Sequence, residues 1–232
     1  MFPFFILISN IICQKLNKSI DFRFVKNSFV RSIQDGIRVT YVPSNIGSAR
    51  IESLYSLSSE FKNQITFEYN VLFENGFEWS KGGKLPGLRG GNKIISTTGC
   101  VRPQPINAWS FRLMWGPMGT ITMYTYDQKR NEQNIPCGIS NYSKVPVLSI
   151  GKWINIKIYM KVNNQQNKGV AKLVINNKLI SYRSNITWCP LNTTIDHIYF
   201  STFYGGDDIS WAPRNSTFIR FINPRIYNYD IV

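Results

Sequence analysis

Residues 109–115 read Trp109-Ser110-Phe111-Arg112-Leu113-Met114-Trp115, and residues 120–126 read Thr120-Ile121-Thr122-Met123-Tyr124-Thr125-Tyr126. Apolar and polar side chains alternate along both stretches, and this period of two is typical of β-strands with one buried face. The loop Pro117-Met118-Gly119 between them is long enough for a three-residue hairpin turn, with Gly119 where a left-handed residue is needed. The sequence therefore predicts a β-hairpin here.

One register keeps the two faces of this hairpin consistent, because a slip of one residue would place Arg112 opposite a core side chain. Counting outward from a Gly116–Thr120 pair gives Trp115–Ile121 and Leu113–Met123 on the core face, and Arg112–Tyr124 and Ser110–Tyr126 on the other. The second face is either an ordinary solvated sheet surface or a site. In a site, nearby cations would lower the pKa of a tyrosine and suit it to general acid or base catalysis.

The same alternation recurs along most of the chain, and we find no long helical pattern. The expected strands are 37–42, 50–57, 64–73, 109–115, 120–126, 153–162, 169–175, 178–182, 197–203 and 217–227. Asn176-Asn177 is typical of a tight hairpin turn between two of them. The fold class is therefore all-β, with two packed antiparallel sheets.

The 232 residues, 43% of them hydrophobic, suffice for one domain with a large core. The apolar run of residues 2–12 is too short to span a bilayer and indicates a signal peptide over residues 1–13, hence a secreted protein. Residues 14–35 are basic and weakly patterned, and form either an extra strand or a loose arm. The main domain is expected over residues 36–232.

The net charge of +14 favours an anionic partner, although a Lys- and Asn-rich composition also produces such a charge. Nucleic acid, an acidic membrane and an acidic polysaccharide are the candidate partner classes. The apolar N-terminus and five N-x-S/T sequons, at Asn17, Asn141, Asn185, Asn192 and Asn215, argue against nucleic acid. We expect a monomer, with no membrane association after signal removal.

Cysteine and histidine usage leaves little room for a metal or for histidine-based catalysis. Without Cys13, three thiols remain, and Cys100–Cys137 is the first choice for a disulfide over pairs with Cys189. The single histidine, His197, is better explained as a strand residue than as a catalytic group. We expect no metal and no cofactor.

Lys84 lies in the segment Gly82-Gly83-Lys84-Leu85-Pro86-Gly87-Leu88-Arg89-Gly90-Gly91. Glycine permits close backbone approach and proline stiffens the chain, so the segment either holds one ammonium in a defined place or forms a tight crossing between strands. It is not a phosphate-binding P-loop, because Leu85 replaces the Ser or Thr that would follow the lysine.

The combined motifs resemble polysaccharide lyase family 14, the alginate and glucuronan lyase group. The resemblance runs from about residue 40 to the C-terminus. It rests on Gly-Gly-Lys-Leu-Pro-Gly-Leu with a following Gly-Gly, Ser-x-Arg-Leu-Met-Trp, Tyr-x-Tyr, Gly151-Lys152-Trp153, Ser201-Thr202-Phe203-Tyr204-Gly205-Gly206 and Ala212-Pro213.

The resemblance implies a β-jelly roll whose concave sheet carries the substrate groove, and metal-free cleavage of an acidic, uronate-containing polysaccharide by β-elimination. It implies that Lys84 is essential, that Ser110 and Arg112 contact substrate, and that Tyr124 and Tyr126 are the active-site tyrosines.

Chemically, Arg112 and Lys84 would neutralise the uronate carboxylate, and either a tyrosine or Lys84 would be the base. Arg89 departs from the family pattern and is expected to bind substrate near Lys84. The alternative is a non-catalytic carbohydrate-binding or coat protein that uses the same residues only to bind.

Overall fold

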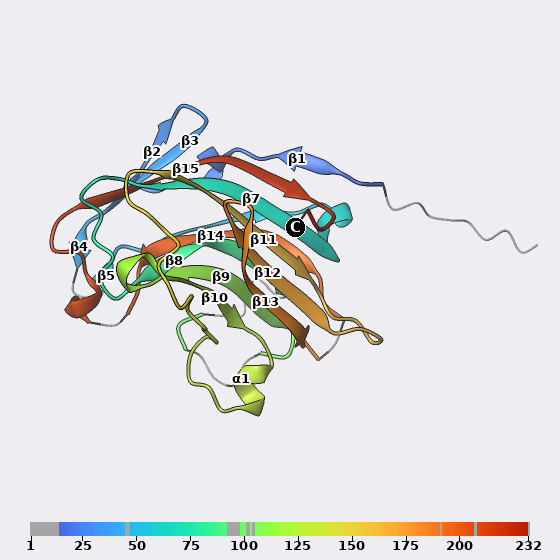
Figure 1. Cartoon of the computed structure of the whole chain (residues 1–232). Coiled ribbons are helices and arrows are strands. Elements are labelled where there is room, and N and C mark those ends of the chain that lie inside the picture. The colour runs from blue at the N-terminus through green and yellow to red at the C-terminus, as the bar shows by residue number, and fades with distance from the viewer. Residues whose placement is uncertain are drawn as a thin grey trace, which may run out of the picture.

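Two antiparallel β-sheets pack face to face and confirm the predicted all-β class (Figure 1). The computed structural model describes residues 14–44, 47–91, 98–100, 103, 105–190, 192–206 and 208–231. The expected signal peptide, residues 1–13, lies outside these ranges.

The larger sheet contains eight strands and runs in the order β13-β12-β11-β7-β15-β3-β2, with β1 paired beside β15. In this order the bounds are Lys178–Ile186, Gly169–Ile175, Trp153–Lys161, Gln64–Phe73, Thr217–Tyr227, Gly36–Tyr41 and Val30–Ile33, and β1 is Asn17–Ser19. Asn176 and Asn177, both with positive φ, form the predicted turn between β12 and β13.

The smaller sheet contains five strands in the order β10-β9-β8-β14-β6. Their bounds are Ile121–Tyr126, Ala108–Trp115, Gly83–Gly91, Ile195–Tyr204 and Ile51–Ser56. A small hairpin of β4 (Pro43–Ser44) and β5 (Gly47–Ser48), one short helix α1 (Lys129–Glu132) and the 3₁₀ turns η1 (Phe22–Phe24), η2 (Ser59–Phe61), η3 (Pro117–Gly119) and η4 (Ile209–Trp211) complete the elements of the described ranges. Within these ranges, no helix has the length and apolar character needed to cross a membrane.

The predicted hairpin register is confirmed at every pair. Leu113 lies opposite Met123, Arg112 opposite Tyr124, and Ser110 opposite Tyr126. The turn closes with a hydrogen bond of 2.8 Å from the Gly116 amide to the Thr120 carbonyl, and Gly119 has the expected positive φ of 81°. Because side chains alternate between faces, this register sends every second residue of β9 into the core and the others to the opposite face.

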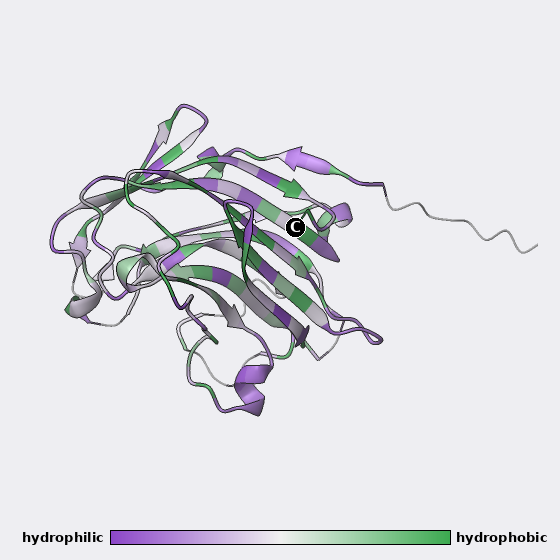
Figure 2. Cartoon of the chain, viewed as in Figure 1, coloured by the Kyte–Doolittle hydropathy of each residue, from purple (hydrophilic) through white to green (hydrophobic). Residues whose placement is uncertain are grey.

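The core fills the space between the sheets with apolar side chains from both. Trp109, Phe111 and Leu113 of β9 are completely buried there, facing residues such as Phe67 and Ile219 of the larger sheet. Figure 2 shows the corresponding alternation of hydrophilic and hydrophobic residues along the strands. The Ser110, Arg112, Tyr124 and Tyr126 side chains do not belong to this core cluster.

Strand β8 is the main element that the sequence did not predict, because glycine and proline indicated a loop there. Pro86 is tolerated in this central strand because the pairing with β9 is interrupted by an irregularity between Leu85 and Leu88, where its missing amide hydrogen costs no ladder bond. At Gly87, a Cβ atom would lie 2.0 Å from the Phe111 carbonyl oxygen and 2.7 Å from the Arg112 Cα. The unusual composition therefore allows β8 to pack directly against β9.

The N-terminal segment is part of the domain rather than a loose arm. Its strands β1 and β2 pair with β15 and β3, and Phe22 is fully buried against Phe67, Phe200 and Phe221. The weak pattern of residues 14–35 reflects short strands joined by a 3₁₀ turn, which produce no long alternation.

Gly87→Ala is expected to destabilise the protein by about 2–3 kcal/mol, because the new methyl group must push β9 away. Gly205→Ala is the matched control, since its Cβ would meet the Trp211 ring at an ordinary 3.4 Å. Chemical denaturation of both variants measures the difference. Equal stabilities would contradict the close approach of β8 and β9.

Candidate functional site

The face of the smaller sheet that points away from the core gathers the predicted site residues. Lys84 comes from β8, Ser110 and Arg112 from β9, and Tyr124 and Tyr126 from β10. The Lys84 Nζ lies 3.7 Å from the centre of the Tyr124 ring, and the Arg112 Cζ lies 5.7 Å from the same ring. The structure thus places one lysine amino group, one guanidinium and two phenols in a single cluster.

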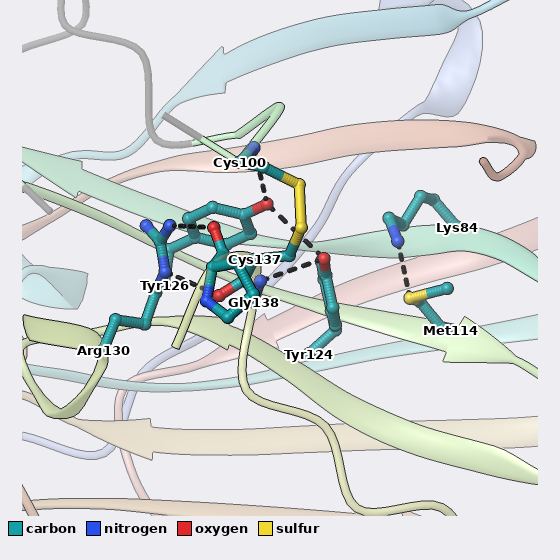
Figure 3. Close-up of a disulfide and its surroundings, with 9 residues drawn as sticks. Lys84, Cys100, Met114, Tyr124, Tyr126, Arg130, Cys137 and Gly138 are labelled. Carbon is teal, nitrogen blue, oxygen red and sulfur yellow. Dashed lines mark hydrogen bonds between the residues drawn. A yellow bond between two sulfur atoms is a disulfide. The ribbon is translucent and has the colours of Figure 1, made fainter. Parts of the chain in front are cut away.

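Lys84 is buried, with only 7% of its surface exposed, and its ammonium donates to the Met114 sulfur on the neighbouring strand (Figure 3). Desolvation, reinforced by the positive charges of Arg112 and Arg50, lowers the pKa of Lys84 well below its usual value of 10.5. A thioether and a ring face do not offset the loss of water around a cation. The neutral amine is therefore favoured at this position.

Arg112 is 1% exposed and lies on the same face between Tyr124, Tyr126 and Tyr199. Its Nη1 donates to Ser201 Oγ over 3.2 Å. Among the described residues, its Nε has no hydrogen-bond partner and no ion pair includes this arginine. A buried guanidinium with spare donors is well suited to bind a carboxylate.

A segment that the sequence had not singled out packs against part of the site face: Gly138 lies against the Tyr124 ring, and the Tyr142 hydroxyl donates to the Met114 sulfur. Residues 136–142, which we call the cover segment, run beside the edge strand β10, where Ile139 and Thr125 exchange two backbone hydrogen bonds of 2.8 and 3.0 Å. On the same face, Ser110 is fully buried and Tyr126 is 2% exposed. The cover segment has no periodic pattern that could have predicted its position.

The two phenols are held close together. The Tyr124 and Tyr126 hydroxyl oxygens lie 3.4 Å apart, and the Tyr124 oxygen accepts a hydrogen bond of 3.0 Å from the Gly138 amide. Burial, followed by the neighbouring Tyr126, raises the pKa of Tyr124 above its usual value of 10, and Arg112 opposes this only weakly. The predicted lowering of the pKa by nearby cations is therefore wrong for Tyr124, because the cover removes water from the phenol.

Arg89 lies further along β8, opposite Ser110 on one side and His197 on the other. Its side chain is half-buried, and desolvation lowers its pKa. Arg89 therefore extends the line of cations along the site face. The single histidine sits within β14, as the strand interpretation expected.

Strands β14 and β6 contribute residues that the sequence had not singled out. Glu52 accepts hydrogen bonds from Tyr199 Oη (2.8 Å) and Ser201 Oγ (3.2 Å), so it is linked to Arg112 through Ser201. The alternation along β14, combined with its register against β6, could have identified these outward side chains. They place one carboxylate at the edge of a basic cluster.

Cys100 and Cys137, the pair preferred from the sequence, form a disulfide, and Cys189 is a free, buried cysteine. Within the described ranges, no group of three or more His, Cys, Asp or Glu residues is placed to hold a metal ion.

The chain matches the family model for polysaccharide lyase 14 over residues 33–223. It is also 25% identical over 210 residues to the exolysin of Paramecium bursaria Chlorella virus 1, an alignment that covers 78% of this chain. The chain spans about a third of the length of that relative (32%).

Solved structures give the same fold. A mutant of the alginate lyase Aly36B in complex with an alginate tetrasaccharide has a TM-score of 0.74 and 20% identity, covering 88% of this chain and 84% of its own. An alginate lyase of family 14 from Aplysia kurodai has a TM-score of 0.69 and 24% identity, covering 82% and 81% of the two chains. These likenesses confirm the predicted β-jelly roll.

Lys84→Met is expected to stabilise the protein at neutral pH, because it removes a poorly solvated amine from a buried position. Each unit of pKa depression corresponds to about 1.4 kcal/mol, and each kcal/mol to about 2–4 °C in Tm for a chain of this size. Between the lowered pKa and 10.5, unfolded wild-type chains bind more protons than folded ones, so wild-type stability rises with pH. The advantage of the variant should therefore shrink as pH approaches 10.5.

Thermal unfolding of both proteins at several pH values measures this difference. Lys178→Met is the control, because it removes an exposed lysine at the start of β13. A Lys84→Met advantage that stays constant with pH would rule out a depressed pKa for Lys84.

Proposed function

Since the chain belongs to the polysaccharide lyase 14 family, we propose that it cleaves an acidic, uronate-containing polysaccharide by β-elimination. Alginate is the first candidate substrate, because the similar structures include alginate lyases, one of them solved with an alginate tetrasaccharide. The +14 net charge of the chain would draw such a polyanion toward it.

The observation that carries this proposal is the buried Arg112 guanidinium. Burying a cation is costly unless an anion or a full set of hydrogen bonds compensates, and within the described residues Arg112 has neither. A uronate carboxylate supplies the missing charge and accepts two parallel hydrogen bonds from a guanidinium. We therefore assign carboxylate binding to Arg112, with Ser110 beside it.

Neutralising the carboxylate makes the adjacent C5 proton removable. The charge that develops as this proton leaves is delocalised into the carboxylate, where the Arg112 cation stabilises it. A planar guanidinium suits this role because its fork of donors matches the two oxygens of a carboxylate.

We assign the role of general base to Lys84. Its lowered pKa favours the neutral amine, and a neutral amine takes up a proton where an ammonium cannot. A tyrosinate base is disfavoured at Tyr124, because burial raises the pKa of that phenol. The two pKa shifts together separate the base from the acid.

The neutral phenol of Tyr124 or Tyr126 then protonates the departing O4. In this step the C5–H electron pair forms the C4–C5 double bond, the C4–O4 bond breaks, and O4 takes the phenolic proton. The products are an unsaturated uronate and a shortened chain, and no water is consumed. Arg89 would contact another carboxylate along the bound polymer.

We also propose that the protein is exported. The Cys100–Cys137 disulfide is typical of oxidising compartments, and the apolar run of residues 2–12 suits a signal peptide. The asparagines of all five sequons are exposed and available for glycosylation.

Purified protein is expected to release unsaturated uronate, detected by its ultraviolet absorbance, from alginate, glucuronan or a related polyuronate, but not from a neutral glucan. Arg112→Gln should lower kcat/KM by about 10²–10³-fold. Lys84→Met and Tyr124→Phe should lower kcat by at least about 10²-fold. Arg31→Gln, at an exposed position of β2, is the matched control and should retain activity.

Two outcomes would contradict this proposal. Polyuronate binding without product would instead identify a carbohydrate-binding or coat protein. Full activity in Arg112→Gln would remove Arg112 from the mechanism.

A bell-shaped pH profile is expected, with an acidic limb from protonation of Lys84 and an alkaline limb from ionisation of the tyrosine acid.

A further inference from the structure

Two backbone segments joined by a disulfide contact the hydroxyl groups of both active-site tyrosines. The Gly138 amide donates to Tyr124 Oη over 3.0 Å, and the Cys100 amide donates to Tyr126 Oη over 3.3 Å (Figure 3). Cys137, the neighbour of Gly138, is joined to Cys100 by the disulfide, although the two cysteines lie 37 residues apart in sequence. The two donors are therefore tied to each other as well as to the two tyrosines.

Arg130 of α1 contacts both the backbone beside Cys137 and the ring of Tyr126. Its side chain is 1% exposed, and it donates from Nε to the Cys137 carbonyl (2.6 Å) and from Nη2 to the Pro136 carbonyl (3.0 Å). Its Cζ lies 4.3 Å from the centre of the Tyr126 ring. Arg130 therefore sets the position of the bridged backbone relative to Tyr126.

The fit against Tyr124 is equally close. A Cβ atom at Gly138 would lie 2.5 Å from Cζ of Tyr124 and 2.7 Å from both Cε atoms. Gly138 does not have a positive φ, so the need for glycine here comes from the phenol and not from the backbone conformation. The ring of Tyr124 consequently has little room to tilt toward the cover segment.

These contacts also decide where the phenolic protons point. A tyrosine oxygen that accepts from a backbone amide directs its own O–H away from that amide. The proton of Tyr124 is then available to Tyr126 or to a bound substrate oxygen. The amide would further stabilise the phenolate left after proton transfer.

We propose that the Cys100–Cys137 bridge, together with Gly138 and Arg130, is a positioning device that aims the Tyr124–Tyr126 pair at the leaving oxygen of the substrate. This inference rests on the proposed function for its catalytic meaning. The contacts themselves are independent of the reaction. Loss of the device should lower proton transfer, hence kcat, more than substrate binding.

The test compares two variants that disturb the device in different ways. Cys100→Ser/Cys137→Ser removes the bridge, while the cover segment remains paired with β10 through Ile139 and Thr125. Gly138→Ala keeps the bridge and displaces Tyr124. Each is expected to lower kcat by about 10²-fold, the effect of a misplacement near 1 Å, with little change in KM. Cys189→Ala, which removes a buried thiol outside the device, should keep the wild-type kcat.

The alkaline limb of the pH profile separates positioning from general stabilisation. Within the part of the chain that the structure describes, the charged or titratable groups recorded against Tyr124 are Lys84, Arg112 and Tyr126, and none of them is changed in the bridge variant. Loss of the bridge frees the backbone around Cys137 and admits water beside Tyr124, so the raised pKa of Tyr124 should fall toward 10 and the alkaline limb should move to lower pH. A lower Tm with unchanged kcat and an unmoved limb would overturn the proposal.

Nuclear magnetic resonance of protein labelled at tyrosine Cζ keeps this test separate from the proposed reaction. Tyr124 and Tyr126 are assigned with their Phe variants, and their titrations are followed with and without the bridge. A fall in the Tyr124 pKa in the bridge variant supports the device even if wild-type protein cleaves no polyuronate. Identical titrations in wild type and in both variants would overturn it, whatever the activity.

Discussion

The pairing of β9 with β8 and β10 is the constraint on which both the core and the site depend. Strand β9 is buried along its whole length, yet its two faces have different chemistry. Trp109, Phe111 and Leu113 complete the sandwich interior, while Ser110 and Arg112 complete the site. Because side chains alternate strictly, one register determines both arrangements. The apolar interior, which contributes most of the folding free energy, therefore also holds the reactive groups in place.

Desolvation is the main cause of the pKa shifts of Lys84 and Tyr124. Lys84 and Arg112 are buried, and Gly138 of the cover segment packs against Tyr124. The pKa of Lys84 falls and the pKa of Tyr124 rises, because burial disfavours the charged form of each group. One physical cause thus supports the roles of base, acid and carboxylate receptor that we propose for these residues. Burying these polar groups costs free energy of folding, which the burial of the large apolar core offsets.

Much of this organisation could be predicted from alternation alone. The strands, the β9–β10 register and the opposed Arg112–Tyr124 pair follow from period-two patterning, since burial of one face imposes it. Strand β8 could not be predicted in this way, because Gly87 and Pro86 serve a close strand contact but have the composition of a loop. The position of the cover segment could not be predicted either, because it has no periodic pattern. Without that position, the direction of the Tyr124 pKa shift was predicted wrongly. The β9–β10 hairpin alone could not predict the pKa of Tyr124, because a segment outside the hairpin limits the access of water to this phenol.

The edge pairing of β1 with β15 has a topological consequence. Asn17 lies opposite Tyr227, so the beginning and the end of the described chain leave from one margin of the larger sheet, whereas the reactive cluster lies on the outer face of the smaller sheet (Figure 1). Both ends of the described chain therefore lie in the larger sheet, away from the cluster on the smaller one. Any segment joined at either terminus would therefore leave the domain beside the larger sheet, away from the Lys84, Arg112 and tyrosine cluster.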